Sequence, residues 1–430
     1  MVRKIRKITA TAQIFGRVNN EVFKMPSSSD TENEVKYLSD AVRIVSICSA
    51  LGAKSVLDCP DTLQKFHRKF GLPNVSMSTI HNRIKMDGAE NARKCSYGFA
   101  RMLQKEKLTR IRLKNDFLPT PTVLHCDGSR VMTHYGVAGT FGGRINHTVD
   151  FEICERGAQE IEASLKIVQR AKEHGINVDI VTNDGIAYSY DYFEELGRLG
   201  IYYFIRLRGD DERNLCVIRH FEDALRLREI KHQEVRKFTI THDDIMFTVR
   251  QLVDIHPVTQ KPVLIARIDS TPVGKKLQRL ESKEKKRKHK DDEFYYEWEE
   301  DPEWERMSEY AMTHYIETNA LFLTPQDVLT IMIDHWTIET HWRKVKRSYW
   351  SRNSYKKDPE GAVVLFVSVS IGIAMTEAVK YGVLLVDLFV GIDVVENVLR
   401  MRFTAEKQWT LLRVRRYVNE VARSKYFCVN

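Results

Sequence analysis

The sequence contains no apolar run long enough to span a lipid bilayer. Its one long uncharged stretch, residues 361–376, has 16 residues and includes Ser368, Ser370 and Gly372, whereas a spanning helix needs about 20 apolar residues. We therefore expect a buried helix here and no membrane partner. The basic N-terminus is also not followed by an apolar segment of useful length, so the sequence predicts no secretory signal.

Paired cysteines are absent as well. The seven cysteines stand singly, and no two of them are separated by only two residues. This pattern predicts neither a disulfide framework nor a zinc knuckle, and it indicates a reducing, intracellular setting. The sequence also has no heptad run that would argue for a coiled coil.

Charge is unevenly distributed along a chain of ordinary globular composition, with 43% hydrophobic and 29% charged residues. The formal net charge is +9. Residues 61–114 contain 13 Lys/Arg and 4 Asp/Glu, and residues 341–357 contain seven Lys/Arg and no acid. Two dense basic segments predict a polyanionic partner, and nucleic acid is favoured over a membrane surface.

The order of the expected elements predicts an α/β fold with a mixed sheet, preceded by an all-α domain. Strand patterns alternate with helical patterns, which is typical of a sheet with antiparallel strands on one side and crossovers on the other. The expected parts, in chain order, are a flexible segment at 1–30, a helical domain at 31–117, an α/β domain at 118–209 and 310–360, a β-rich insertion at 210–309, and a helical region at 361–430.

The insertion contains a loop in which charge is segregated. Residues 283–290 are strongly basic, whereas residues 291–305 carry nine acids, no base and five aromatic side chains. One interpretation is a solvated loop whose two halves attract each other. The other is a wedge in which Trp298 or Trp304 stacks on unpaired bases.

The helical domain contains a candidate helix-turn-helix. Residues 61–70 and 76–85 read as short helices, and residues 71–75 between them form a glycine-containing turn. In this motif the second helix reads DNA, and its polar side chains here are Ser78, Thr79, Asn82 and Arg83. A plain helical hairpin gives the same pattern, so both interpretations stay open.

Two apolar runs each carry an aspartate to the end of an expected strand. Residues 121–129 contain Asp127 and residues 178–185 contain Asp184, and each aspartate is followed by glycine. Such short runs are typical of strands buried on both faces. An Asp-Gly pair is also a common turn. If the two strands are neighbours, both carboxylates lie at one edge of the sheet.

A third carboxylate lies on a later helix, which Thr324 and Pro325 are expected to begin. Spacings of three, four and seven place five side chains of this helix on one face: Met332, His335, Glu339, Arg343 and Lys346. Such a face lies either in solvent or along a charged site. Three carboxylates in an α/β fold can hold two Mg²⁺ ions, which prefer hard oxygen ligands.

With these residues in place, the chain resembles the DDE transposases of prokaryotic insertion sequences. The glutamate signature of that family runs Tyr, two spacers, Arg, three spacers, Glu, six spacers, Lys, and the corresponding residues here are Met332, His335, Glu339 and Lys346. Residues 124–128 and 181–207 are similar to the first and second aspartate regions, so the resemblance covers about residues 120–360.

The chain departs from the family pattern at three positions. Met332 stands in place of Tyr, His335 in place of Arg, and Asn183 in place of an Arg that is common before the second aspartate. All three carboxylates of the family are present.

The resemblance implies a ribonuclease H-like fold and a cut-and-paste enzyme that acts on double-stranded DNA at element ends and at the target. Mg²⁺, or Mn²⁺ in its place, would be bound by the catalytic residues Asp127, Asp184 and Glu339. We expect DNA phosphates to be held by Lys346, Arg343, His335 and Arg206. The enzyme would work as a homodimer in the synaptic complex, in the cytoplasm at the nucleoid.

Two other functions are consistent with the same residues. One is a DNA-binding protein derived from a transposase, with catalysis impaired at the Met332 and His335 positions. The other is a ribonuclease H-like nuclease, which would cut DNA without joining it.

Overall fold

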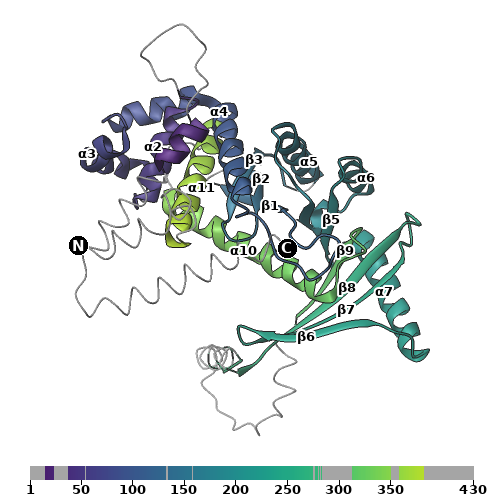
Figure 1. The fold of residues 1–430 in the computed structure, drawn as a ribbon. Coiled ribbons are helices and arrows are strands. Elements are labelled where there is room, and N and C mark those ends of the chain that lie inside the picture. The colour runs from purple at the N-terminus through teal and green to yellow at the C-terminus, as the bar shows by residue number, and fades with distance from the viewer. Residues whose placement is uncertain are drawn as a thin grey trace, which may run out of the picture.

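The computed structural model of the chain describes residues 15–23, 37–53, 55–131, 134–156, 158–274, 277–278, 280, 282, 312–349 and 358–381. These residues form a layer of helices next to a mixed sheet of nine strands, as Figure 1 shows. The mixed α/β class expected from the sequence is thus confirmed. The segregated charged loop at 283–305 lies outside the described residues.

The first five strands form one half of the sheet, in the spatial order β3-β2-β1-β4-β5. The strands β1 and β2 form an antiparallel hairpin, β3 is antiparallel to β2, and β4 is parallel to both β1 and β5. Their bounds are β1 Val123–Val131, β2 His134–Phe141, β3 His147–Ile153, β4 Ile180–Asp184 and β5 Tyr202–Leu207. The hairpin strands and crossovers expected from the sequence are confirmed.

Helices cover both faces of this half. The crossover helices α5 (Ala158–Glu173) and α6 (Tyr190–Arg198) pack on one face, because their apolar side chains share a core with Leu124, Val181 and Ile205. The helix α10 (Pro325–Tyr349) packs on the other face, in a core with Val123, Ile180 and Phe204. Successive strand residues point to opposite faces, so the two cores alternate along each strand.

The other four strands extend the same sheet from β5. The strand β9 (Met312–Thr318) pairs antiparallel with β5, and β8 (Pro262–Pro272), β7 (Ile245–Ile255) and β6 (Arg236–His242) follow in antiparallel pairs. The β-rich insertion therefore does not form a separate sheet but widens the central one.

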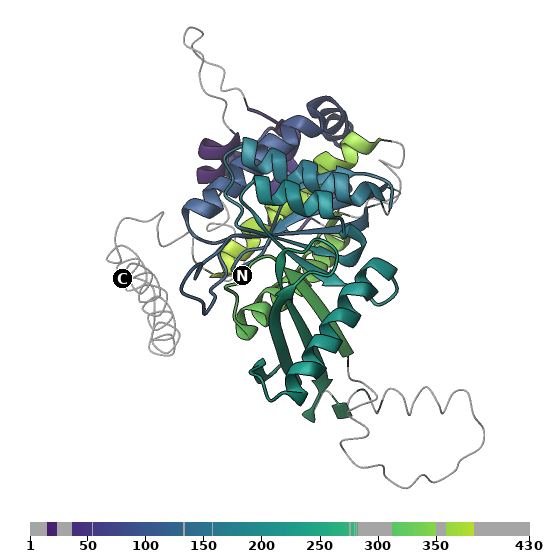
Figure 2. The same ribbon diagram turned by 90° about the vertical axis from the view of Figure 1, so that its right-hand side faces the viewer.

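One prediction within the insertion is wrong. The sequence predicts a β-rich insertion from residue 210 onward, but residues Glu212–Ile230 form the helix α7, which lies alongside the added strands in Figure 2. Asp211 caps this helix by accepting hydrogen bonds from the backbone N–H groups of Arg213 and Asn214. A narrow buried stripe, Val217, Phe221 and Leu225, faces the sheet.

The helical layer consists of N-terminal helices gathered around a C-terminal one. The helix α11 (Pro359–Tyr381) packs against α2 (Asp40–Ala50), α4 (Met77–Lys105) and β3. Among the described helices, α11 alone is long and apolar enough to cross a membrane, yet 89% of its apolar window is buried inside the protein. The prediction of a buried helix over residues 361–376 is confirmed, and α11 serves as the centre of the helical layer.

The prediction of a flexible segment at residues 1–30 is wrong for residues 15–23. Phe15, Val18 and Phe23 are at most 1% exposed and belong to the helical core. Phe15 makes an edge contact with Phe70, with 6.0 Å between the ring centroids. These contacts are made to distant residues, so local periodicity could not reveal them. Residues 1–14 and 24–36 lie outside the described residues.

The two helices of the expected helix-turn-helix are present. The helix α3 (Cys59–Phe70) ends at Gly71, whose φ of 58° is the left-handed conformation that favours glycine, and Ser76 caps the start of α4. The second helix is longer than predicted, because α4 continues to Lys105 across a break at Gly88.

Candidate active site

Asp127 and Asp184 lie at matching positions of two neighbouring parallel strands. The register of β1 and β4 pairs His125 with Thr182, and each aspartate stands two residues further along its strand. Neighbouring strands lie about 4.8 Å apart, and residues two apart point to the same face. The two carboxylates therefore lie side by side on one face of the sheet.

The glycines after the two aspartates have different roles. The strand β1 does not turn at Gly128 as expected but continues to Val131, and a Cβ at Gly128 would lie 1.9 Å from the Tyr135 hydroxyl and 2.7 Å from Glu160 Oε2. The chain does leave β4 at Gly185. Each glycine N–H donates to the carboxylate before it, at 2.8 Å for Asp127 and 2.9 Å for Asp184.

The helix that carries Glu339 lies over the same face as the two aspartates. His125 Nε2 lies 2.7 Å from Asp334 Oδ2, and Thr182 Oγ1 lies 2.7 Å from His335 Nδ1. Both partners belong to α10, so the side chains of His125 and Thr182 point toward that helix. Because the aspartates share the face of these residues, α10 and the carboxylate pair are on one side of the sheet.

Glu339 stands four residues after His335, one turn further along α10. The side chains of Glu339, Arg343 and Lys346 lie outside the part of the chain that the structure describes. Among the described side chains, no three of His, Cys, Asp or Glu gather as a metal site. Beyond the turn that holds Glu339, Trp342 and Val345 are buried against the helical layer.

The negative charge of the carboxylate pair, Asp127 and Asp184, is only partly balanced by described cations. Burial, and then the charge of Asp184, raises the pKa of Asp127 to about 7. Arg206 on β5 offsets part of this charge, because its Nε donates to Asp184 Oδ1 at 3.0 Å. Two adjacent carboxylates with only one described cation bonded to them form a donor set of hard oxygens, which suits a divalent ion such as Mg²⁺.

His314 belongs to this neighbourhood, although the sequence did not reveal it. Its ring lies 5.6 Å from Trp336 of α10, centroid to centroid. Burial and then the charge of Arg206 lower the pKa of His314, whereas Asp184 raises it. The strand pairing explains this position. Ile316 pairs with Arg206, so His314, two residues earlier on β9, lies on the same face of the sheet as Arg206.

Of the three positions that depart from the family pattern, Met332 and Asn183 are buried and His335 is partly buried. Met332 is 1% exposed in the core under α10. His335 is held by Thr182, and burial lowers its pKa well below the ordinary value, so its imidazole is neutral. Asn183 points to the opposite face, where its Oδ1 accepts a hydrogen bond from Tyr192 at 3.0 Å.

The expected DNA-reading residues lie in the first turns of α4, the helix that follows α3 in the helical layer (Figure 1). Ser78 and Asn82 are exposed, and Arg83 forms an ion pair with Asp40 at 3.3 Å. Thr79 is partly buried and its hydroxyl lies 3.0 Å from Ser76 Oγ. The exposed face also includes Lys85, which the sequence analysis missed.

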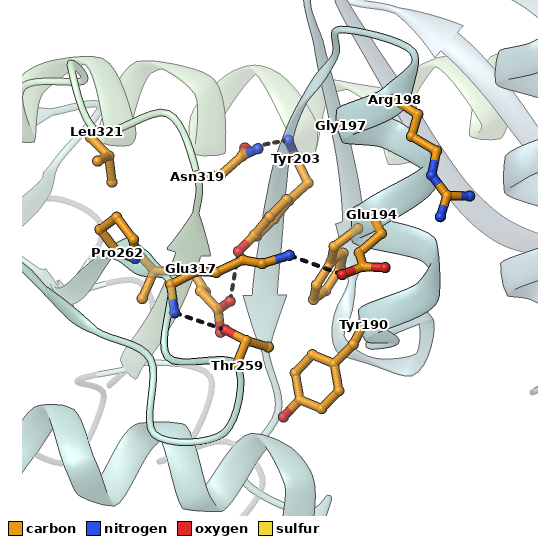
Figure 3. A pocket seen from close by; sticks show the side chains of 13 residues that line it. Tyr190, Glu194, Gly197, Arg198, Tyr203, Thr259, Pro262, Glu317, Asn319 and Leu321 are labelled. Atoms are coloured by element: carbon orange, nitrogen blue, oxygen red, sulfur yellow. Dashed lines mark hydrogen bonds and ion pairs between the residues drawn. The ribbon is translucent and has the colours of Figure 1, made fainter.

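A cavity of about 610 Å³ lies on the other face of the sheet, between α6, β5 and β9 (Figure 3). Its buried carboxylate, Glu317, accepts hydrogen bonds from Tyr188 and Tyr203 at 2.8 and 2.9 Å. Burial raises the pKa of Glu317 to about 7. Because Glu317 pairs with Ile205, it shares the face of α6. This cavity is therefore separate from the carboxylate pair.

Comparisons with known proteins do not assign the chain to a family. No protein-family model matches the chain, and no curated protein matches it.

We predict that Asp127→Asn raises the free energy of unfolding at pH 8 when divalent ions are absent. Since the folded pKa of Asp127 is about 7 against an ordinary 3.8, the wild-type protein loses stability as the pH rises through that interval, and the amide variant does not. The melting temperatures of the wild type and the variant, measured as the pH rises through this interval, should diverge by a few degrees. Millimolar MgCl₂ should raise the melting temperature of the wild type and barely change that of the variant.

The matched control is Glu162→Gln, which makes the same chemical change on the exposed surface of α5, where Glu162 pairs only with Lys166 in the described structure. The melting temperature of this variant should change with pH and with MgCl₂ as that of the wild type does. Equal stabilisation of wild type and Asp127→Asn by MgCl₂ would show that Asp127 does not bind the ion.

Proposed function

We propose that the chain is a DDE-type DNA transposase that cuts and joins phosphodiester bonds at the ends of a mobile element. The observation that carries this proposal is the placement of Asp127 and Asp184 at matched ends of parallel strands, on the face covered by the helix of Glu339. Carboxylates that are distant in sequence and gathered in this way suit metal-assisted phosphoryl transfer.

The strand order supports a ribonuclease H-like catalytic domain. The sequence predicts a sheet with antiparallel strands on one side and strands reached by crossovers on the other, in the region that resembles the transposases. The order β3-β2-β1-β4-β5 agrees with it. The strands β6 to β8 would then be the insertion between the second aspartate and the glutamate, and β9 would belong to the catalytic domain.

The residues present fit a pair of Mg²⁺ ions. Asp127, Asp184 and Glu339 offer only oxygen ligands, as Mg²⁺ prefers. Burial, and then the charge of Asp184, raises the pKa of Asp127, and a bound cation would offset both effects. When bound, such ions activate the attacking water or 3′-hydroxyl and stabilise the leaving oxygen.

The chain's own cations would hold the DNA backbone near the carboxylates. Arg206 is one third exposed and can turn from Asp184 toward a phosphate once a metal ion neutralises that carboxylate. Arg343 and Lys346 stand one and two turns beyond Glu339 in the same helix, which also places them along a bound strand. His335 would contribute by holding α10 in place, because its Nδ1 faces Thr182.

DNA ends would be recognised by the helical layer. The exposed, polar and basic face at the start of α4 follows a short helix and a turn, as in helix-turn-helix proteins. Joining two element ends requires that both are held together, so a homodimer on DNA is part of the proposal.

A transposase-derived DNA-binding protein is the second candidate. It is favoured by the burial of Met332 and by the engagement of His335, because neither side chain replaces the hydroxyl or guanidinium that the transposase signature provides.

Strand cleavage and strand transfer on a DNA fragment that carries the inverted repeats flanking the reading frame test the proposal. We expect the purified protein to cut and join such ends in Mg²⁺, and we expect Asp184→Asn and Glu339→Gln to abolish both steps while leaving end binding intact. Glu162→Gln is the control and should retain full activity, because Glu162 lies on the other face of the sheet.

The possible outcomes separate the candidates. Cutting without joining would identify a nuclease of the same fold. Binding of the ends without cutting would identify the DNA-binding derivative. Cleavage that persists in Asp184→Asn would overturn the assignment of the carboxylates.

DNA recognition by α4 gives a further prediction. Lys85→Ala should weaken binding to all DNA and lower the slope of log K against log salt by about one, since one phosphate contact is lost. Asn82→Ala should cost about 1–3 kcal/mol on the element end only, because base contacts carry sequence preference. Fluorescence anisotropy on end and unrelated duplexes measures both.

Lys166→Ala, which removes an exposed lysine from α5, is the matched control and should bind like the wild type. Unchanged binding by both α4 variants would mean that these helices are a hairpin without a role in DNA recognition.

A further inference from the structure

Four side chains form a continuous hydrogen-bond network beneath the carboxylate pair. Asp334 Oδ2 lies 2.7 Å from His125 Nε2, and His125 Nδ1 lies 2.7 Å from Thr182 Oγ1. Thr182 Oγ1 in turn lies 2.7 Å from His335 Nδ1. His125 is fully buried, Thr182 is 1% exposed, and Asp334 and His335 are partly buried. We call these four residues the buried network.

Every link of the buried network can pair a donor with an acceptor. The Asp334 carboxylate only accepts, so it receives the Nε2–H of His125 and, at 3.1 Å, the backbone N–H of Gly143. When Nε2 carries the only proton of the His125 ring, Nδ1 accepts from the Thr182 hydroxyl, and Thr182 accepts from the Nδ1–H of His335. Each hydrogen bond therefore fixes the direction of the next one.

The backbone makes room for Asp334. A Cβ at Gly142 would lie 1.7 Å from Asp334 Oδ2 and 2.6 Å from His125 Nε2. No side chain can occupy that position while the network is intact. The Gly142-Gly143 pair after β2 thus provides both the space for this carboxylate and one of its donors.

The network connects the three elements that carry the proposed metal ligands. His125 stands two residues before Asp127 on β1, and Thr182 stands two residues before Asp184 on β4. His335 stands one turn before Glu339 on α10. A shift of α10 along the sheet would stretch two hydrogen bonds of 2.7 Å, one to each strand.

Apolar packing alone does not fix this geometry. The residues Val328, Ile331 and Met332 seat α10 on the sheet through nondirectional contacts, which tolerate small translations of a helix. Hydrogen bonds weaken steeply as distance and angle depart from the optimum. The network therefore adds directional contacts that hold α10 to both strands.

The order carboxylate, imidazole, hydroxyl is also that of a hydrolytic triad, with Thr182 as the nucleophile. Burial excludes this function, because neither Thr182 nor His125 is accessible to a substrate. In addition, the Thr182 oxygen already contacts two imidazoles.

We propose that the buried network is a positioning device that holds the Glu339 turn of α10 against the ends of β1 and β4, and that Thr182 thereby sets the affinity of the site for divalent ions. This inference rests on the proposed function, because it concerns the same metal ligands. Thr182 and His125 touch no reacting atom in it and act only through the three carboxylates.

The test compares three variants of the full-length chain. Thr182→Val keeps the shape of the side chain and removes the hydroxyl, and Thr182→Ser restores the hydroxyl. Thr140→Val is the matched control, because Thr140 is a fully buried strand threonine whose hydroxyl lies 3.2 Å from that of Thr148, outside the network. Mn²⁺ binding is measured by electron paramagnetic resonance, and the Mg²⁺ dependence of cleavage is measured separately.

We expect Thr182→Val to weaken Mn²⁺ binding by roughly 10- to 100-fold, as is typical when a residue supporting metal ligands is removed. Saturating Mg²⁺ should restore most of its cleavage rate, so the half-saturating concentration changes more than the maximal rate. Thr182→Ser and Thr140→Val should bind Mn²⁺ like the wild type. A purely structural defect would lower the melting temperature without moving the half-saturating concentration.

Wild-type Mn²⁺ affinity in Thr182→Val, or an equal loss in Thr140→Val, would overturn the positioning role. A wild-type protein that binds Mn²⁺ but cuts no DNA would refute the transposase proposal alone, and the network would still be judged by the affinities of the variants. A wild-type protein that binds no Mn²⁺ would overturn both.

Discussion

The parallel pairing of β1 with β4 determines the geometry on which the site depends. Since His125 is paired with Thr182, both strands advance equally and reach their aspartates at the same level. A slip of one residue would turn one carboxylate to the opposite face, where α5 and α6 lie. The same pairing presents His125 and Thr182 to α10, so one register aligns the two aspartates with each other and with the glutamate's helix.

Bringing carboxylates together has an electrostatic cost that shapes the surroundings. Burial and mutual repulsion raise the pKa of Asp127, and Arg206 offsets part of the charge of Asp184. Rigid elements hold the pair together in spite of this cost, since β1 and β4 lie inside a nine-stranded sheet with helices on both faces. If the pair binds a cation as proposed, little of the binding free energy is lost in ordering the ligands, because the strands already hold them in place.

Patterns among residues close in the sequence were sufficient to predict part of this structure. The apolar runs ending in Asp127 and Asp184, and the cap formed by Thr324 and Pro325, are properties of neighbouring residues, so the strands and the start of α10 could be predicted. The burial of residues 15–23 and the place of His314 depend on distant contacts and could not. The helix α7 was missed because its apolar stripe is narrow, and the buried network depends on how α10 crosses the sheet.

The most direct test of the account is a crystal structure of the chain with Mn²⁺, in which anomalous scattering locates the ions. We expect anomalous peaks bounded by carboxylate oxygens of Asp127, Asp184 and Glu339, with α10 joined to both strands through Thr182. Peaks elsewhere, or an ion held by the two aspartates while Glu339 points away, would contradict the account.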